Sequence, residues 1–470
     1  MSRSREHVPT DTSWDAHHRF LLAGVVCLVT VVALESMAIS TVMPVVEEDL
    51  GDLWLYGWVF SAFYLGTLVG VVVGGRAVDR VRPIGPMMIG IAIFTAGLLV
   101  GGLAPSMAVL VIGRFLQGLG AGAVPAVSYV CVGRGFPAEM RPKVFAIMST
   151  AWVLPSLVSP LLASVVADAF GWRWVFLGLI PITALVALIG GPPVATVETP
   201  AQPEGAQDAG TPISTVLLLT FGAVLLLSGL GMERLWLGLP LAALGVVLGL
   251  PAFRRLTPEG TLRARPRLPA AVLTRGVLTF SFFSADAFVS LSLTSVRGRS
   301  TAFAGVVLIS SSITWTIGSW IQARFGERYG ANRLVRIGGL LLVVGALGLA
   351  ASLHEAVPIV MWPIAACVLG LGMGMSYTVL SVVTLGEAEP GREGAATSAL
   401  QMSDILGVSL GTGFAGVLVS LGDRLDRPDW VPLAAVFLLA AAMGAAVAAL
   451  APRLTRGKDL AAPTVISERA

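Results

Sequence analysis

The chain has 470 residues, of which 55% are apolar and only 13% are charged, about half the charged share of ordinary soluble domains. Its mean hydropathy of +0.84 excludes a set of soluble domains, because most of the chain would not be stable in contact with water. The net charge of +3 is small, and basic residues in short clusters between apolar runs are typical of membrane orientation rather than of a nucleic-acid surface. The apolar runs are continuous, which excludes a transmembrane β-barrel and predicts an all-α polytopic membrane protein.

About 14 apolar runs are each close to the ~20 residues that a helix needs to cross a bilayer. They lie at 20–43, 55–74, 86–104, 107–131, 143–167, 173–191, 213–230, 233–251, 273–295, 301–322, 333–352, 357–384, 397–420 and 431–451.

The segments between the runs predict the organisation of the chain. We expect a cytoplasmic N-terminal tail, a six-helix bundle, a flexible cytoplasmic linker rich in proline, glycine and alanine, and an inserted transmembrane hairpin. A basic cytoplasmic linker, a second six-helix bundle and a disordered cytoplasmic tail follow. In this order the segments span 1–19, 20–191, 192–212, 213–251, 252–272, 273–451 and 452–470.

Arginine and lysine predict the orientation. The loops on the same side as the N-terminus carry Arg76, Arg80, Arg82, Arg134, Arg141, Lys143, Arg254, Arg255, Arg263, Arg265, Arg267, Arg324, Arg328, Arg333, Arg453, Arg456 and Lys458. The opposite loops are acidic, mixed or nearly uncharged, except for Arg297 and Arg299. This positive-inside pattern predicts a multi-pass protein of a bacterial cytoplasmic membrane with both termini in the cytoplasm.

An internal repeat relates the two predicted bundles. The sequence Gly118-Leu-Gly-Ala-Gly122 matches Gly370-Leu-Gly-Met-Gly374, and Glu35 matches Asp286 at nearly the same spacing. Parallel repeats of this kind are typical of transporters, although glycine-rich apolar helices also resemble one another by chance.

Charged residues inside the apolar runs are the strongest candidates for function, because an unpaired charge in hydrocarbon is costly. Glu35 and Arg114 fall at similar predicted depth, so a direct or water-mediated contact is allowed; a purely structural ion pair is the alternative. Asp286 lies near the middle of its run. The alternative is that the predicted boundary of this helix is wrong and that Asp286 lies near the helix end. Asp404, with Gln401 one turn earlier, is either a gate residue or a structural cap.

Other chemistries find no support in the sequence. No Gly-x-x-x-x-Gly-Lys-[Ser/Thr] loop occurs, and the glycines of 118–122 lie within an apolar helix with no preceding soluble strand, so we expect no nucleotide site. The four histidines and three cysteines are scattered, and no serine has a histidine and an aspartate at catalytic spacing. We therefore expect no metal, no cofactor and no enzymatic activity.

Several motifs resemble the major facilitator superfamily, specifically its 14-helix drug:proton antiporters. The matching segments are Leu34-Glu35 with Val42-Met43-Pro44, Gly75-Arg-Ala-Val-Asp79-Arg80, Arg114-Phe-Leu-Gln-Gly-Leu-Gly120, Ser159-Pro-Leu-Leu-Ala-Ser164 and Gly171-Trp-Arg-Trp-Val-Phe176. The resemblance implies two six-helix bundles that rock about a central cavity. It also implies a conformational latch at Gly75, Asp79 and Arg80.

Together these observations predict a proton-coupled secondary transporter, expected to work as a monomer in the lipid bilayer and to export a lipophilic or cationic small molecule. Glu35, Asp286 and Arg114 are expected to couple protons, since burial favours the protonated form of a carboxyl group. The expected cavity residues are Tyr129, Trp152, Phe282, Phe283, Tyr377, Gln401 and Asp404. For each aromatic residue among them, the alternative is that it only packs against other helices and contacts no substrate. Proton-coupled uptake, lipid-like metabolite export and a receptor or scaffold remain open, and no nucleic-acid partner is expected.

Overall fold

The structure is a computed structural model that describes residues 16–137, 153–197, 212–389 and 393–454, with residues 140, 144, 147, 148 and 151 between them. Within these ranges the secondary structure is helical and contains no strand. This confirms the predicted all-α fold.

The elements before the hairpin are α1 (Ala16–Leu50), η1 (Leu53–Leu55), α2 (Tyr56–Arg80), α3 (Ile84–Gly102), α4 (Met107–Ala121), α5 (Ala123–Gly135), α7 (Val153–Phe170), α8 (Arg173–Leu177) and α9 (Leu179–Ala195). The hairpin consists of α10 (Ile213–Leu230) and α11 (Leu235–Leu256). The remaining elements are η2 (Thr261–Arg263), α12 (Leu268–Leu291), η3 (Ser292–Val296), α13 (Thr301–Tyr329), α14 (Ala331–Ser352), α15 (Met361–Gly386), α16 (Glu393–Arg424), α17 (Trp430–Leu450) and η4 (Ala451–Arg453).

Among the described residues, 13 helices are long and apolar enough to cross a membrane. Two of them each combine two α-helices, α4 with α5 and α8 with α9, because these helices follow one another closely. The predicted run 143–167 corresponds to a shorter apolar helix, Leu154–Phe170, and part of that run lies outside the described residues. The count agrees roughly with the predicted 14 helices, and the chain is a multi-pass membrane protein.

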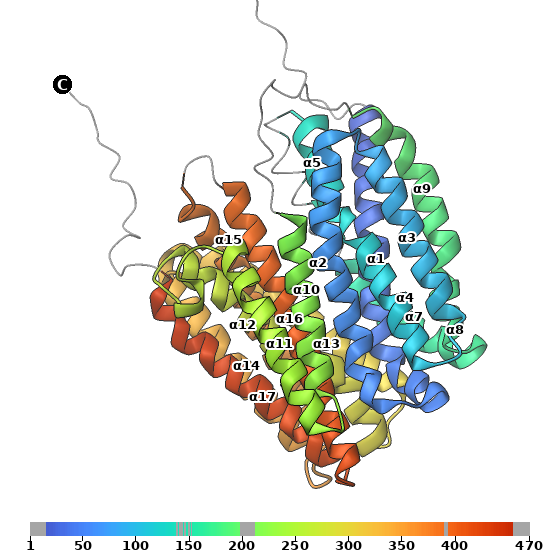
Figure 1. Cartoon of the computed structure of the whole chain (residues 1–470), viewed down its shortest axis with the longest axis vertical. Coiled ribbons are helices and arrows are strands. Elements are labelled where there is room, and N and C mark those ends of the chain that lie inside the picture. Colours follow the sequence, from blue (N-terminus) through green and yellow to red (C-terminus); the bar gives the residue numbers. More distant parts are fainter. Residues whose placement is uncertain are drawn as a thin grey trace, which may run out of the picture.

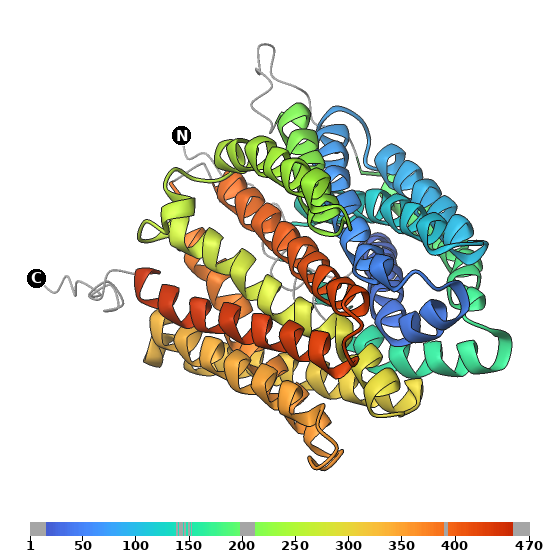
Figure 2. The same cartoon turned by 60° about the horizontal axis from the view of Figure 1, so that its bottom comes forward.

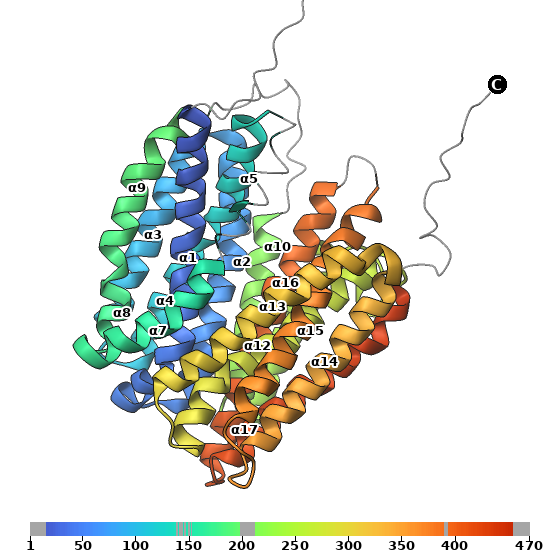
Figure 3. The ribbon, with the colours of Figure 1, turned by 180° about the vertical axis from the view of Figure 1, so that it is seen from behind.

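The helices gather into two groups with the hairpin between them (Figure 1). Helices α1–α9 lie on one side and α12–α17 on the other, as the view from behind also shows (Figure 3). Hairpin helix α10 packs against both α2 and α16, one from each group. The two groups approach each other at the lower end of Figure 1 and diverge toward the upper end.

Small residues allow α2 and α16 to meet closely at the lower end. A Cβ atom built on Gly57 would lie 2.6 Å from the Cα atom of Gly416 and 2.7 Å from the Thr412 carbonyl oxygen. One turn further along α2, the Ser61 hydroxyl donates to the Ser409 carbonyl at 2.9 Å, and the Ser409 hydroxyl donates to the Ser61 carbonyl at 3.3 Å. These reciprocal hydrogen bonds join the two groups of helices.

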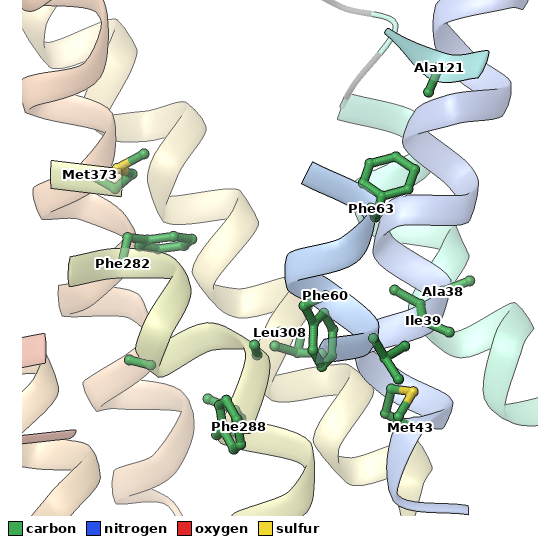
Figure 4. Close-up of a cluster of buried hydrophobic side chains, with 14 of the residues drawn as sticks. Ala38, Ile39, Met43, Phe60, Phe63, Ala121, Phe282, Phe288, Leu308 and Met373 are labelled. Carbon is green, nitrogen blue, oxygen red and sulfur yellow. The ribbon is translucent and has the colours of Figure 1, made fainter. Parts of the chain in front are cut away.

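An apolar cluster accompanies this junction (Figure 4). Met43 of α1 and Phe60 of α2 belong to the first group, whereas Phe288 of α12 and Leu308 of α13 belong to the second. All four side chains are buried, and the ring of Phe288 lies 5.1 Å from that of Tyr56. We call the contact between Gly57 and Gly416, with the hydrogen bonds between Ser61 and Ser409 and these apolar residues, the lower junction.

Replacing Gly57 with alanine is expected to force the lower junction apart, because the added methyl group meets backbone atoms that cannot move independently. The change should destabilise the closed junction by about 1–3 kcal/mol. We expect a cysteine introduced at the buried position Met43 to react faster with a maleimide in this variant. Gly386→Ala is the control, because nothing lies within 4 Å of its added methyl; equal labelling rates in the two variants would contradict the role of the junction.

Candidate transport site

A buried ion pair joins α1 to α4. The guanidinium of Arg114 pairs with the carboxylate of Glu35, and the two side chains are 1% and 2% exposed. Arg114 also donates from Nη1 to Oε1 of Gln117 at 2.5 Å and from Nε to the Val59 carbonyl at 3.1 Å. Its guanidinium carbon lies 4.4 Å from the centre of the Phe63 ring. Because Val59 and Phe63 belong to α2, one arginine holds three helices of the first group together.

A second charged cluster lies in the other group of helices. Arg275 of α12 places Nε 3.3 Å from Oδ1 of Asp404 on α16, and the Tyr377 hydroxyl of α15 donates to Oδ2 of Asp404 at 2.9 Å. The Arg275 guanidinium carbon lies 3.0 Å from the centre of the Tyr377 ring, and Nη1 donates to the Tyr377 carbonyl at 2.5 Å. Asp404 is 16% exposed at its side chain, so this pair is less shielded than Glu35 and Arg114.

Asp286 differs from both pairs. It lies in the second half of α12, five residues before the helix ends at Leu291, is partly exposed, and forms no ion pair or side-chain hydrogen bond with any residue that the structure describes. Its charge is therefore not neutralised by a neighbouring side chain there. An acid in this setting favours a positively charged ligand.

A row of aromatic rings connects the two groups of helices. Its centroid distances are 5.4 Å from Phe63 to Tyr64, 6.1 Å from Tyr64 to Phe283, 6.3 Å from Phe283 to Trp315 and 5.4 Å from Trp315 to Tyr377. Tyr64, Phe283, Trp315 and Tyr377 are each partly exposed. We call these four residues the ring row.

The ring row and the unpaired acid share one region. Tyr64, which lies in α2, interacts electrostatically with both Asp286 and Asp404, which lie in α12 and α16. Asp286 also lies within one turn of Phe283 on α12. Aromatic faces attract cations within about 6 Å of their centre, so a carboxylate near the rings of Tyr64 and Phe283 can hold a lipophilic cation.

The structure brings together some of the predicted site residues. Phe282 is buried and packs its ring 5.1 Å from that of Phe283 and 5.2 Å from that of Trp315. Gln401 lies on α16 one turn before Asp404 and is partly exposed. Trp152 and the side chain of Tyr129 lie outside the described residues, so their assignment to the cavity stays a prediction.

The predicted latch lies at the far end of α2. Gly75 has open space around it, and Arg80 is exposed at the last residue of the helix. The side chain of Asp79 lies outside the described part of the chain. The latch role of these three residues is thus still a prediction.

Sequence reasoning missed Arg275, Tyr64 and Trp315. Arg275 falls only two residues inside the predicted run 273–295, where an arginine is ordinarily a helix-end residue at the membrane surface. In the structure the helix begins earlier, at Leu268, and the side chain of Arg275 is only 4% exposed. Tyr64 and Trp315 are aromatic residues within apolar runs, and the sequence alone does not show which of them face the partner bundle.

Removing a paired charge and removing an unpaired charge should have different effects on the free energy of unfolding. Replacing Arg114 with methionine leaves the Glu35 carboxylate without its partner, which should cost about 3–5 kcal/mol of unfolding free energy. Replacing Asp286 with asparagine breaks no described contact and should leave stability unchanged or raise it. Denaturant unfolding in detergent micelles measures both; an Arg114→Met variant as stable as the wild type would show that the pair does not hold the first group together.

Comparison with known proteins agrees with this architecture. A family model described as Major Facilitator Superfamily matches residues 25–385. A Mycobacterium tuberculosis protein named "Probable multidrug-efflux transporter" is 26% identical over 416 residues, covering 85% of this chain and 87% of that protein. The multidrug efflux pump SdrM of Staphylococcus aureus is 23% identical over 406 residues, covering 84% of this chain and 89% of the pump.

Among solved structures, a D-xylose–proton symporter superposes with a TM-score of 0.68 at 14% sequence identity. The match covers 95% of this chain and 99% of the symporter, so the likeness of fold extends over both groups of helices and the whole membrane domain. With the family model matching most of the chain, these findings show that the chain belongs to the Major Facilitator Superfamily.

Proposed function

We propose that this protein is a proton-coupled antiporter that exports lipophilic, positively charged small molecules by alternating access. The observation that carries the proposal is Asp286, an acid within the membrane that no described side chain neutralises, near Tyr64 and Phe283 of the ring row. The printed names of the two relatives, which describe multidrug efflux, support the same class of substrate.

The substrate site is assigned to the space between the two groups of helices. Tyr64 comes from the first group, and Phe283, Trp315 and Tyr377 come from the second. A ligand that contacts all four rings therefore touches both moving parts. Aromatic stacking and apolar contact tolerate many ligand shapes, whereas Asp286 selects for positive charge.

Glu35 is assigned the coupling proton. In the state described here its carboxylate is paired with Arg114 and almost completely shielded. A proton on Glu35 would cancel the attraction between these two groups and release Arg114 from one of its partners. Arg114 also donates a hydrogen bond to Val59 of α2. A shift of Arg114 on its release would therefore alter a contact of α2, the helix that carries Gly57 and Ser61 of the lower junction.

The arrangement of the helices supports an inward-open state. The two groups meet at the lower junction and diverge at the other end (Figure 1). The positive-inside pattern assigns the diverging end, which carries the basic loops, to the cytoplasm. From that side a substrate would enter. Gly75, Asp79 and Arg80 belong to this end of α2, and we assign them the latch of the opposite state.

Glu35→Gln is expected to abolish proton coupling, because glutamine keeps the size and hydrogen bonding of glutamate but exchanges no proton. One pH unit supplies ~1.4 kcal/mol per proton, which allows about tenfold accumulation of a monovalent cation that is exchanged for one proton. A membrane potential adds ~2.3 kcal/mol per 100 mV only for each net charge moved in the cycle. In proteoliposomes with an imposed pH gradient, the wild type should concentrate a fluorescent lipophilic cation and Glu35→Gln should not. Exchange of substrate for substrate, which needs no proton, should remain in the variant.

The matched control is Glu48→Gln, the same substitution at an exposed position of the same helix. This variant should accumulate the cation as the wild type does. If Glu35→Gln still concentrates the cation under the same gradient, Glu35 is not the coupling residue. Asp286 would then be the next candidate.

A further inference from the structure

The connection between α11 and α12 carries a dense set of positive charges. Arg254 and Arg255 end α11, and Arg263 and Arg265 lie in and just after η2; all four are exposed. None of the four guanidinium groups has an ion-pair or hydrogen-bond partner among the residues that the structure describes. Glu259, within the same connection, is exposed, and Glu387 is paired with Arg267 at 3.5 Å.

Backbone hydrogen bonds hold this connection in one shape. The amide of Arg263 donates to the Gly260 carbonyl at 3.0 Å, that of Arg265 donates to the same carbonyl at 3.1 Å, and that of Ala264 donates to Thr261 at 2.9 Å. Ala264 has a φ of 47°, a left-handed conformation that a residue with a Cβ adopts only when its surroundings enforce it. The arginines therefore project from a defined scaffold.

The end of α17 is part of the same scaffold. Arg453 donates from Nη1 to the Arg263 carbonyl at 3.2 Å, and its own carbonyl accepts from the Arg267 amide at 2.8 Å. The connection and the end of α17 lie at the same end of the second group of helices, at the left of Figure 2. The charges thus surround the ends of three membrane-spanning helices, α11, α12 and α17.

We propose that this surface, formed by Arg254, Arg255, Arg263 and Arg265, binds the head groups of anionic phospholipids. The four unpaired guanidinium groups follow the ends of apolar helices that are long enough to span a membrane, where lipid phosphates are expected, and guanidinium matches phosphate oxygens in a two-pronged geometry. Leu262, between the charged positions, is 38% exposed and gives an acyl chain an apolar contact.

A lipid is favoured over a soluble anion by this position. The surface follows directly on membrane-spanning segments, where clusters of four or more basic residues attract anionic lipid. Each basic residue near such a surface strengthens binding about fivefold. The proposal does not depend on what the protein transports, since it rests on the connection between α11 and α12 alone.

The test uses native mass spectrometry of the purified full-length protein in detergent with equal amounts of phosphatidylglycerol and phosphatidylcholine. The wild type should retain phosphatidylglycerol in preference to phosphatidylcholine. Replacing all four arginines with glutamine should lower phosphatidylglycerol retention at least about tenfold and remove the preference, whereas replacing all four with lysine should keep most of it.

The matched control is the double variant Arg234→Gln with Arg299→Gln, which removes two exposed arginines from loops at other helix ends and should bind as the wild type does. If the glutamine variant of all four residues folds poorly, the pair Arg263→Gln with Arg265→Gln is measured instead and should still weaken binding severalfold. Undiminished phosphatidylglycerol retention in the glutamine variants would overturn the proposal. Displacement of the lipid by inorganic phosphate at equal concentration would also overturn it, because the surface would then be a site for a soluble anion.

Discussion

The high cost of an unpaired charge in hydrocarbon is the constraint on which the rest of this structure depends. Glu35 and Arg114 neutralise each other in the first group of helices, and Arg275 and Asp404 do so in the second. Each arginine also stacks on an aromatic ring, Arg114 on Phe63 and Arg275 on Tyr377. Charge neutralisation within each group leaves the groups free to move against each other without separating opposite charges.

The contacts between the groups that are described above are of a different kind. At the lower junction they are glycine backbones, hydroxyl groups and apolar side chains, and nearer the middle they are the rings of Tyr64 and Phe283. Such contacts can be broken and remade at low cost, since hydroxyl groups find other partners and apolar surface can be covered by ligand or lipid. This division between ionic contacts within groups and weak contacts between them is what an alternating-access transporter requires.

Much of the fold could be predicted from the sequence, because long apolar runs leave few alternatives to membrane-spanning helices. The helix ends were less certain, as Arg275 shows: the predicted run placed it near the membrane surface, whereas the helix starts five residues earlier than that run. The depths of Glu35 and Arg114 allowed their contact to be anticipated. The ring row could not be anticipated, because its members come from α2, α12, α13 and α15, and an aromatic residue in an apolar helix looks the same whichever neighbour it faces.

The residues that the sequence repeat matches do not have the same surroundings in the structure. It pairs Glu35 with Asp286, yet only Glu35 meets an arginine, and the arginine of the second group, Arg275, instead meets Asp404. Two related helices therefore carry acids in different electrostatic settings. This difference is the basis for assigning the proton to Glu35 and the substrate cation to Asp286.

The most direct test compares the binding of two similar ligands to the wild type and to Asp286→Asn in detergent. Tetraphenylphosphonium is a lipophilic cation, and triphenylphosphine oxide is a neutral molecule of related shape. The account predicts that Asp286→Asn weakens binding of the cation about tenfold or more, a loss of ~1.4 kcal/mol, and leaves binding of the neutral ligand nearly unchanged. Equal affinity of the wild type and Asp286→Asn for tetraphenylphosphonium would contradict it.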